Sequence, residues 1–134
     1  MARKKIRVAI NGFGRIGRAA FKIMLTSNRY EVVAINDLAP VENLAYLLKY
    51  DTVYGIYPKK VSHSGNNIVV NGKKYNITAV PDPKNLPWKK LKVDVVLECT
   101  GRFVKDGAAG AHITAGAKRV IISAPAKGGG NVDT

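Results

Sequence analysis

Short apolar runs alternate with a segment of helical spacing in the first part of this chain. Residues 6–10 and 31–36 are mostly apolar and β-branched, which is typical of buried strands. Between them the apolar positions follow the i, i+3, i+4, i+7, i+8 spacing of one helix face, and this helix is expected to end near residues 27–28. The face consists of Ile16, Ala19, Ala20, Ile23 and Met24. A strand, a helix and a strand within about thirty residues predict a βαβ crossover between parallel strands.

A second helix and a hairpin are expected next. Pro40 is typical of a helix start, and the residues after it make a broad apolar helix face. This face consists of Val41, Leu44, Ala45, Leu47 and Leu48. The dipeptide Asn71-Gly72 lies between the apolar runs 68–70 and 75–77. That arrangement predicts an antiparallel hairpin closed by a type I′ turn.

Later segments return to the alternation of strands and helices. Strands are expected at residues 93–97 and 120–122, and a weak helix interrupted by glycine is expected at residues 104–115. Buried apolar strands separated by helices predict a parallel sheet that is covered on both faces. The expected fold class is therefore α/β, a Rossmann-type, doubly wound, mostly parallel sheet with an inserted antiparallel hairpin.

The composition is that of a single folded domain. The chain has 134 residues, of which 46% are hydrophobic, and this is enough for one core. Its apolar stretches are too short to span a bilayer, and its basic start leads into a strand rather than a signal-peptide core, so we expect no membrane association. The single cysteine excludes an internal disulfide and suits a reducing compartment, which favours the cytoplasm.

The net charge of +13 comes from 22 Lys and Arg residues against 9 Asp and Glu residues. Such a charge attracts polyanions, including nucleic acid, anionic membranes and phosphorylated metabolites. The cations are scattered in small clusters at residues 3–5, 59–60, 73–74 and 89–92. This favours a solvated basic surface whose nucleic-acid binding is nonspecific. A basic module that binds nucleic acid or an anionic surface stays open as the alternative.

A Gly-x-Gly-x-x-Gly motif directly follows the first strand and opens the first helix. Gly12 allows a tight turn, Gly14 lets a pyrophosphate approach the backbone, and Gly17 permits close packing of helix and strand. The helix starts at about Arg15, so its unpaired N–H groups and its positive dipole end face the phosphates. The context favours a dinucleotide site over a glycine-rich turn without a ligand.

Asp37 lies 20 positions after Gly17, at the end of the second strand. At that offset its carboxylate can accept hydrogen bonds from the adenosine ribose hydroxyls, and it would repel a 2′-phosphate. The predicted cofactor is therefore NAD rather than NADP. Taken alone, Asp37 could instead be a turn residue or the cap of the second helix.

Two more strand ends supply polar groups to the same edge of the sheet. Thr100-Gly101 and Ser123 follow predicted strands, and they are candidates for the ribose or nicotinamide half of the cofactor. Ordinary strand-end turns explain them equally well by position.

Cys99 could be a nucleophile at a strand end, but a lone cysteine after four apolar residues is more often a small buried hydrophobic residue. His63 and His112 have no partner at a spacing typical of a catalytic pair, and we interpret both as structural. No Cys/His cluster has metal-site spacing, so no metal is expected.

Five segments of the sequence, in this order, resemble glyceraldehyde-3-phosphate dehydrogenase. They are residues 9–18, 33–38, 46–53, 98–103 and 122–127, and the resemblance covers nearly the whole chain. Only the related erythrose-4-phosphate dehydrogenases share most of them. The resemblance implies a role in glycolysis, namely NAD-dependent oxidation and phosphorylation of an aldehyde in a cytosolic homotetramer. It leaves open whether the aldehyde phosphate has three or four carbons.

The resemblance also implies individual cofactor contacts. Arg15 and Ile16 are expected to bind the pyrophosphate through their backbone, and Asp37 to bind the adenosine ribose. Ser123 is expected near the nicotinamide riboside, with Thr100 close by. The family's cofactor loop includes two more residues of this chain, Asn11 and Phe13.

The sequence departs from the family at several positions. Pro81 replaces an arginine that contacts the adenine side of the cofactor, and Tyr54 replaces a histidine. The helix expected at residues 105–111 contains Gly107 and Gly110, and each glycine costs about 1 kcal/mol in a helix interior.

The family's Ser-Cys-Thr-Thr-Asn nucleophile segment, its catalytic histidine, its phosphate-binding residues and its C-terminal helix lie beyond Thr134. Residues 1–134 are therefore expected to form an incomplete NAD-binding domain with no catalytic residue, which binds NAD without turnover. Such a chain would be a fragment, or half of a split enzyme that needs a catalytic partner chain. Without the C-terminal helix we expect an exposed apolar face, with low stability or self-association.

Overall fold

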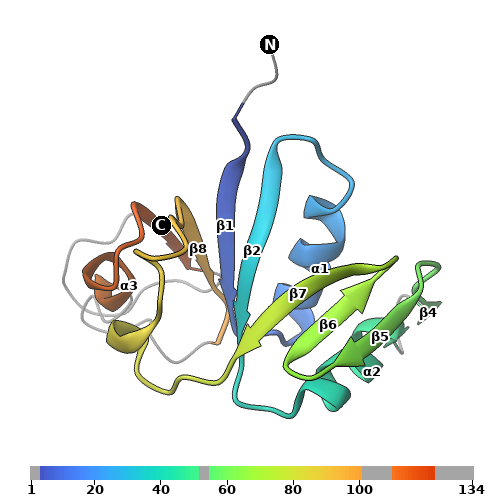
Figure 1. Cartoon of the computed structure of the whole chain (residues 1–134). Helices are drawn as coiled ribbons and strands as arrows, with labels where there is room; N and C mark the ends of the chain where they lie inside the picture. Colours follow the sequence, from blue (N-terminus) through green and yellow to red (C-terminus); the bar gives the residue numbers. More distant parts are fainter. Residues whose placement is uncertain (1–3, 52–54, 101–109, 123–134) are drawn as a thin grey trace.

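A seven-stranded sheet with the order β5-β6-β7-β2-β1-β8-β9 forms the centre of the part of the chain that the structure describes (Figure 1). The structure is a computed structural model, and it describes residues 4–51, 55–100 and 110–122. The strands of this sheet are β1 (Ile6–Asn11), β2 (Tyr30–Asn36), β5 (Val61–Ser64), β6 (Asn67–Val70), β7 (Lys73–Thr78), β8 (Val95–Glu98) and β9 (Arg119–Ile122). The other elements are helices α1 (Arg15–Met24), α2 (Val41–Lys49) and α3 (Ala111–Thr114), a 3-10 turn η1 (Pro83–Asn85), and a ribbon of β3 (Tyr50–Asp51) and β4 (Gly55–Ile56).

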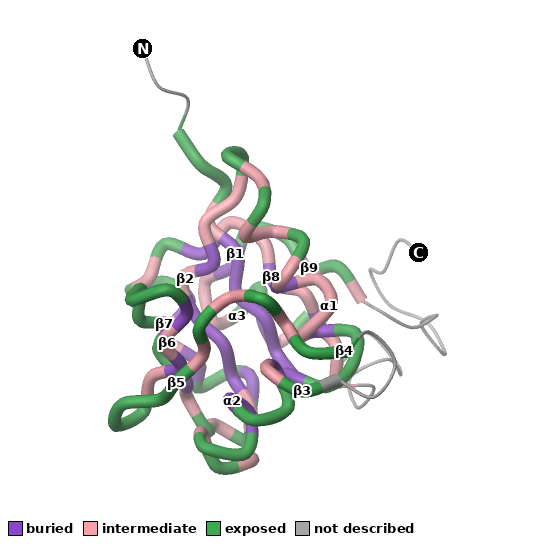
Figure 2. Tube along the Cα trace, turned by 90° about the vertical axis from the view of Figure 1, so that its right-hand side faces the viewer, coloured by how far each residue is buried: buried purple, intermediate pink, exposed green. Residues whose placement is uncertain are grey.

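The parallel part of the sheet confirms the predicted fold class. β1 lies between β2 and β8 and is parallel to both, and β9 continues the sheet in parallel beyond β8. Hydrophobic clusters lie on both faces. One contains Ile10, Phe21 and Leu48 from the side of α1 and α2, and the other contains Ala9 and Trp88 from the side of η1 and α3. Buried residues follow the central strands in Figure 2, as expected of a sheet that is covered on both sides.

The predicted antiparallel insertion is confirmed and is joined to the main sheet. β6 and β7 pair antiparallel, and β7 also pairs parallel to β2 through Ile77 and Thr78. Asn71 has a φ of 49° and Gly72 a φ of 86°, and two consecutive positive φ values are what a type I′ turn requires. Strand β5 adds a third antiparallel strand that was not predicted, because its residues are mostly polar and exposed at the edge of the sheet.

Only part of the apolar face predicted for α1 meets the core, because Met24 packs against the core cluster whereas the two isoleucines of that face do not. Ile16 is 56% exposed and Ile23 is 69% exposed, whereas Gly17 and Phe21 are buried. The cause lies at Gly17, where a Cβ atom would overlap the carbonyl oxygen of Gly12. This close packing turns the Gly17 side of the helix to the sheet, and the stripe that starts at Ile16 lies about 100° away.

Several predicted boundaries also change. α1 ends at Met24 rather than near residues 27–28, and β8 begins two residues later than expected. Of the helix expected at 104–115, the described part is α3, and Gly110 is its N-cap rather than an interior residue, so the expected helix cost does not apply there. Tyr54 and Gly107 lie outside the described residues. None of the described helices has the length and apolarity needed to cross a bilayer.

Candidate functional site

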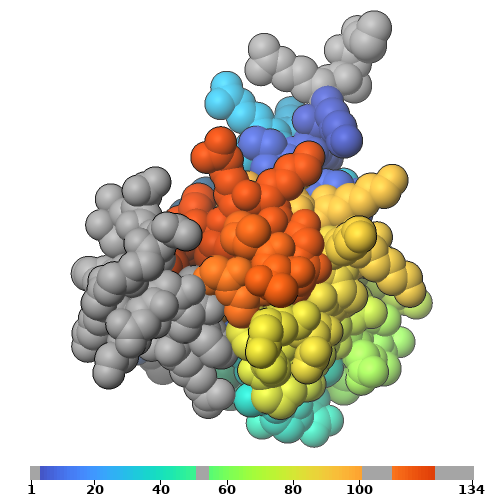
Figure 3. All heavy atoms as spheres, turned by 90° about the vertical axis from the view of Figure 1, so that its left-hand side faces the viewer, coloured from blue at the N-terminus to red at the C-terminus, as the bar shows by residue number. Residues whose placement is uncertain are grey.

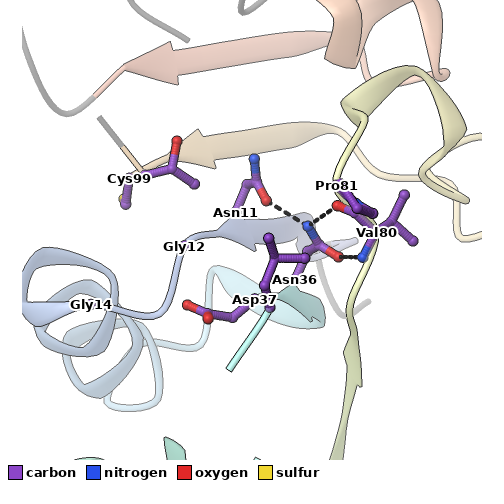
Figure 4. A pocket seen from close by; sticks show the side chains of 10 residues that line it. Asn11, Gly12, Gly14, Asn36, Asp37, Val80, Pro81 and Cys99 are labelled. Carbon is purple, nitrogen blue, oxygen red and sulfur yellow. Dashed lines mark hydrogen bonds between the residues drawn. The ribbon is translucent and has the colours of Figure 1, made fainter. Parts of the chain in front are cut away.

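A cavity of about 230 Å³ lies where β1, β2 and β8 end, and the segment after β7 closes one side of it (Figure 4). Parallel strands place their carboxyl ends at one edge, which is where open α/β sheets bind ligands. The lining residues are Asn11, Gly12, Gly14, Asn36, Asp37, Leu38, Val80, Pro81, Cys99 and Thr100. The structure therefore brings five of the predicted site residues into one cavity wall, namely Asn11, Gly12, Gly14, Asp37 and Thr100.

The other predicted residues lie beside or outside this cavity. The Phe13 side chain is buried in the core under the loop, and Gly17 packs on Gly12. Arg15 and Ile16 form the exposed first turn of α1, with their backbone next to Gly14. Gly101 and Ser123 lie outside the described residues.

The glycine-rich turn leaves room for a ligand at Gly14 and none at Gly12. Gly12 has a φ of +94°, and a Cβ atom there would lie 2.8 Å from the backbone nitrogen of Thr100. At Gly14 a Cβ atom would meet nothing within 4 Å. Helix α1 begins directly after Gly14, with no side chain capping its N-terminus and no acidic residue in its first turn. The N–H groups of this turn are thus available to an anion.

Asp37 ties the glycine-rich turn to the end of β2. One carboxylate oxygen accepts a hydrogen bond from the Phe13 backbone N–H at 2.7 Å, and the other accepts one from the Ala39 N–H at 2.9 Å. The bond to Ala39 is a local turn contact, so Asp37 also has the turn role that its sequence position allowed as an alternative. Since each carboxylate oxygen has two lone pairs, both oxygens keep acceptor capacity toward the cavity.

A chain of side-chain hydrogen bonds crosses the strand ends below the cavity. Asn36 donates to the Asn11 amide oxygen at 2.8 Å and to the Val80 carbonyl at 3.0 Å. The amide oxygen of Asn36 accepts bonds from the Thr78 hydroxyl at 2.7 Å and the Val80 N–H at 2.9 Å. These bonds fix which way both amides point, and Figure 4 shows the Asn11–Asn36–Val80 part.

This chain of hydrogen bonds continues to Glu98, the last residue of β8, which is 1% exposed. One of its oxygens accepts from Asn11 Nδ2 at 2.6 Å and from His112 Nε2 at 2.8 Å. The other accepts from the Thr100 backbone N–H at 2.9 Å and from the Thr100 hydroxyl at 2.6 Å. Burial raises the pKa of the Glu98 carboxyl, but the hydrogen bonds from His112, Thr100 and Asn11 outweigh burial and hold the pKa below its ordinary value.

The tautomer of His112 follows from its neighbours. The Trp88 indole can only donate, and it donates to His112 Nδ1 at 2.9 Å. The proton therefore sits on Nε2, and the neutral ring donates it to Glu98. The 3.4 Å approach of Asn11 Nδ2 to His112 Nε2 brings together two donors that share one Glu98 oxygen. The structural role expected of His112 can therefore be stated specifically. Its ring donates to Glu98, and Glu98 in turn bonds to Asn11 and Thr100 of the cavity wall.

The expectation that Cys99 is a small buried hydrophobic residue is wrong. Cys99 is half-buried and lines the cavity, so it is not a core residue. Its backbone N–H donates to the Asn11 carbonyl at 2.8 Å, which holds the β8 end against β1. Among the described residues, no three His, Cys, Asp or Glu side chains are grouped as a metal site would need.

Sequence reasoning missed Asn36, Glu98 and Trp88 as parts of this site. Glu98 offered one usable signal, a charged residue that directly ends an apolar strand. Asn36, a polar residue that ends the apolar strand β2, offered a similar signal, whereas Trp88 offered none, since its partner His112 lies 24 residues away in the chain.

Comparisons with known proteins agree with this geometry. The family model described as "Glyceraldehyde 3-phosphate dehydrogenase, NAD binding domain" matches residues 6–106. The chain is 52% identical over 124 residues to glyceraldehyde-3-phosphate dehydrogenase of Mycoplasma pneumoniae, which covers 92% of this chain and 37% of that protein. It is 55% identical over 122 residues to the Geobacillus stearothermophilus enzyme of the same name, and this match covers 91% of this chain and 36% of that protein. The chain thus spans little more than a third of the length of these curated relatives. With three quarters of its residues matched by the family model, the chain belongs to the family of glyceraldehyde-3-phosphate dehydrogenase NAD-binding domains.

Proposed function

We propose that this chain binds NAD in the cavity at the carboxyl edge of its sheet. Asp37 receives the adenosine ribose, the turn from Gly12 to Gly17 receives the pyrophosphate, and Thr100 lies toward the nicotinamide half. The observation that carries this proposal is the open space at Gly14 directly beneath the uncapped start of α1. A dinucleotide supplies the two negative phosphates that such a helix start favours.

The carboxylate of Asp37 sets the choice between the two nicotinamide dinucleotides. Both of its oxygens already accept a backbone N–H, so its position is fixed and its negative charge stays at the ribose site. A 2′-phosphate would meet this charge at short range, whereas a 2′-hydroxyl can donate to it. NAD is therefore preferred over NADP.

Calorimetric titration of the 134-residue chain tests this assignment. We expect NAD to bind with one-to-one stoichiometry and NADP to bind about tenfold more weakly or worse, since like charges at an interface disfavour the wrong partner. Asp37→Asn is expected to weaken NAD binding about tenfold, because its amide group would face the Phe13 or Ala39 N–H without accepting from it. Glu42→Gln, an exposed acid in the first turn of α2, is the matched control and should bind as the unmodified chain does. If the titration shows no saturable heat of binding at millimolar NAD, the assignment of the cavity to NAD is wrong.

In the whole protein we propose that this domain serves the phosphorylating oxidation of an aldehyde in the cytoplasm. The bound nicotinamide ring supplies the hydride acceptor for that reaction, and the residues of this chain bind and orient it. The nucleophile would come from a catalytic part beyond residues 1–134, either on the same polypeptide or on a partner chain. The chain of 134 residues is then a cofactor-binding unit without turnover of its own.

The exposed stripe on α1 supports a second proposal, that the chain associates with a further copy of itself. Ile16 and Ile23 lie one above the other on the solvent side, with Ala19 and Ala20 between them. A contiguous apolar stripe on an exposed helix favours protein contacts. The net charge of +13 opposes this contact, so added salt should strengthen it by screening the repulsion.

Ile23→Lys is expected to shift the chain toward monomer in sedimentation velocity, because it places a charge in the middle of the contact. Ile113→Lys changes an exposed isoleucine on α3, at a different surface, and should leave the distribution unchanged. A chain that stays monomeric at high concentration in salt would show that the stripe drives no association.

The basic residues suggest only a nonspecific partner. Some of the cations lie at the amino edge of the sheet, opposite the cavity, where Arg7 and Arg119 flank Asp94 through backbone bonds. In Figure 3 the blue start of β1 lies above the orange residues around β9, and the gold segment before β8 lies beside them on the right. Arg7 pairs with Glu31 and Lys118 pairs with Asp94, so part of this charge is neutralised. We propose that any nucleic-acid binding here is weak, salt-dependent and independent of sequence.

A further inference from the structure

Phe13, in the glycine-rich turn, is held at three points. Its side chain is fully buried and packs edge-on against Phe21, with 5.4 Å between the ring centroids. Its backbone N–H donates to Asp37 at 2.7 Å, and its carbonyl accepts a hydrogen bond from Nη1 of Arg18 at 3.1 Å. The peptide groups on both sides of Phe13 are therefore fixed. The second of them leads into Gly14, where the structure leaves space for a ligand.

Arg18 reaches this turn from inside α1. Its backbone N–H donates to the Gly14 carbonyl at 2.9 Å, and its side chain points back to the Phe13 carbonyl, the usual direction of helical side chains. In a planar trans peptide group the C=O and the N–H point in opposite directions. By holding these two carbonyls, Arg18 also fixes where the N–H groups of Gly14 and Arg15 point. Both N–H groups lie at the helix start, where no intrahelical partner exists for them.

The position of Arg18 is unfavourable for the helix itself. It lies within the first four residues of α1, where the helix dipole disfavours a positive charge, and the first turn has no acidic residue to offset it. None of the ion pairs among the described residues includes Arg18. Its Nε is buried, and within the described part of the chain nothing accepts a hydrogen bond from it. An unsatisfied buried donor costs stability, so stability alone does not explain this arginine.

A residue that breaks local rules beside a ligand site is typical of function. We propose that Arg18 is a positioning residue for the pyrophosphate of NAD, acting through the carbonyl of Phe13. It holds the peptide group between Phe13 and Gly14 in the orientation that the ligand needs before the ligand arrives. This inference rests on the proposed function, and it adds a residue that does not itself line the cavity. Donors that are ordered in advance spare the ligand the entropy cost of ordering them.

Calorimetry with the Arg18→Met variant tests the effect on the ligand. Methionine keeps a long unbranched stem and a similar helix propensity, but it donates no hydrogen bond. We expect NAD affinity to fall about tenfold with a less favourable binding entropy, because the turn must then be ordered on binding. The matched control is Lys22→Met, which removes a charge one turn later in α1, where the Lys22 ammonium lies 4.9 Å from the Tyr57 ring centroid. Its NAD affinity should stay within about twofold.

Two further measurements separate positioning from simple charge attraction. In the chain without NAD, amide hydrogen exchange at Phe13 should be about tenfold faster in Arg18→Met and unchanged in Lys22→Met, because only the first variant releases the turn. The ratio of NAD affinities between the unmodified chain and Arg18→Met should be the same at low and at high salt. A ratio that falls toward one as salt is added would assign the effect to charge alone and overturn the proposal.

The remaining outcomes are equally definite. Unchanged NAD affinity in Arg18→Met, or unchanged exchange at Phe13, would show that Arg18 does not position the turn. Should Arg18→Met fail to fold, Arg18→Lys keeps the charge but loses the planar guanidinium, and it should show the same two changes in smaller measure. Failure of the unmodified chain to bind NAD would count against the proposed function, whereas the exchange experiment would still report whether Arg18 holds the turn.

Discussion

Gly17→Ala is expected to lower the free energy of unfolding by about 3 kcal/mol or more and to abolish NAD binding. Alanine is the better helix former, which alone would stabilise α1 by about 1 kcal/mol. The added methyl group would overlap the carbonyl oxygen of Gly12, and a backbone atom cannot rotate away as a side chain can. Overpacking in a well-packed core costs about 1–3 kcal/mol, and a backbone overlap belongs at the upper end of that range or above it.

Gly14→Ala is the contrasting variant in the same motif. Gly14 has an extended backbone with φ −80° and ψ −160°, which alanine adopts freely, and its surroundings are open. We expect an unchanged thermal midpoint and a large loss of NAD affinity, because the methyl group would occupy the space assigned to the pyrophosphate. Circular dichroism melts and calorimetry distinguish the two outcomes. A stable Gly17→Ala chain that binds NAD would show that α1 can shift on the sheet at little cost.

Acid is expected to unfold the chain well before all of its carboxyl groups are protonated. Hydrogen bonds hold the pKa of Glu98 below its ordinary value despite its burial. At Asp94 the backbone N–H of Arg7 lowers the carboxyl pKa, burial opposes this, and Lys118 lowers it further. In both cases the folded state binds a proton less readily than the unfolded state.

The sign of the pH dependence follows from these two directions. The stability that these carboxylates contribute is fully present above their unfolded pKa values, about 3.9 for Asp and about 4.3 for Glu. It is lost as the pH falls from there through the lower folded values, because the unfolded chain takes up the protons first. Urea unfolding followed by circular dichroism at a series of pH values measures this loss.

Two controls identify the groups responsible for the acid effect. Concentrated salt screens the general repulsion of a chain with net charge +13, but it leaves the buried Glu98 site nearly unaffected. Glu98→Gln should start from a lower stability and show a flatter pH dependence, while Asp94→Asn removes only the partly exposed contribution. Stability that stays constant or increases on acidification would contradict the role of Glu98.

The local parts of this fold could be predicted from the sequence because their causes are local. The crossover from β1 through α1 to β2 follows from spacing, and the Asn71-Gly72 turn follows from the tolerance of both residues for positive φ. In the cavity wall, Gly12 and Gly14 were predicted because the Gly-x-Gly-x-x-Gly spacing encodes a close approach to the backbone. Asp37 followed from its offset and Thr100 from its place after a strand, whereas Asn11 was implied only by the family resemblance.

The remaining features depend on contacts between distant segments. The side of α1 that meets the sheet is decided by Gly17 against Gly12, and hydrophobic periodicity, which gives glycine no weight, points to a stripe of which Ile16 and Ile23 face solvent. The support of the wall joins Asn11 to Glu98 across 87 residues and Glu98 to His112 across 14. No spacing rule connects such residues, since it is the parallel pairing of β1 and β8 that brings them together.

Trp88 gives the molecule an optical reporter of its own. It is the single tryptophan, it is fully buried, and one intermediate ring connects it to the carboxylate behind the cavity wall. Indole emission responds to the hydrogen bond that its N–H makes, so the colour and intensity of this fluorescence follow the state of His112 and Glu98. The local loosening of the wall therefore has a spectroscopic signature distinct from the melting of α1 and α2, without any attached dye.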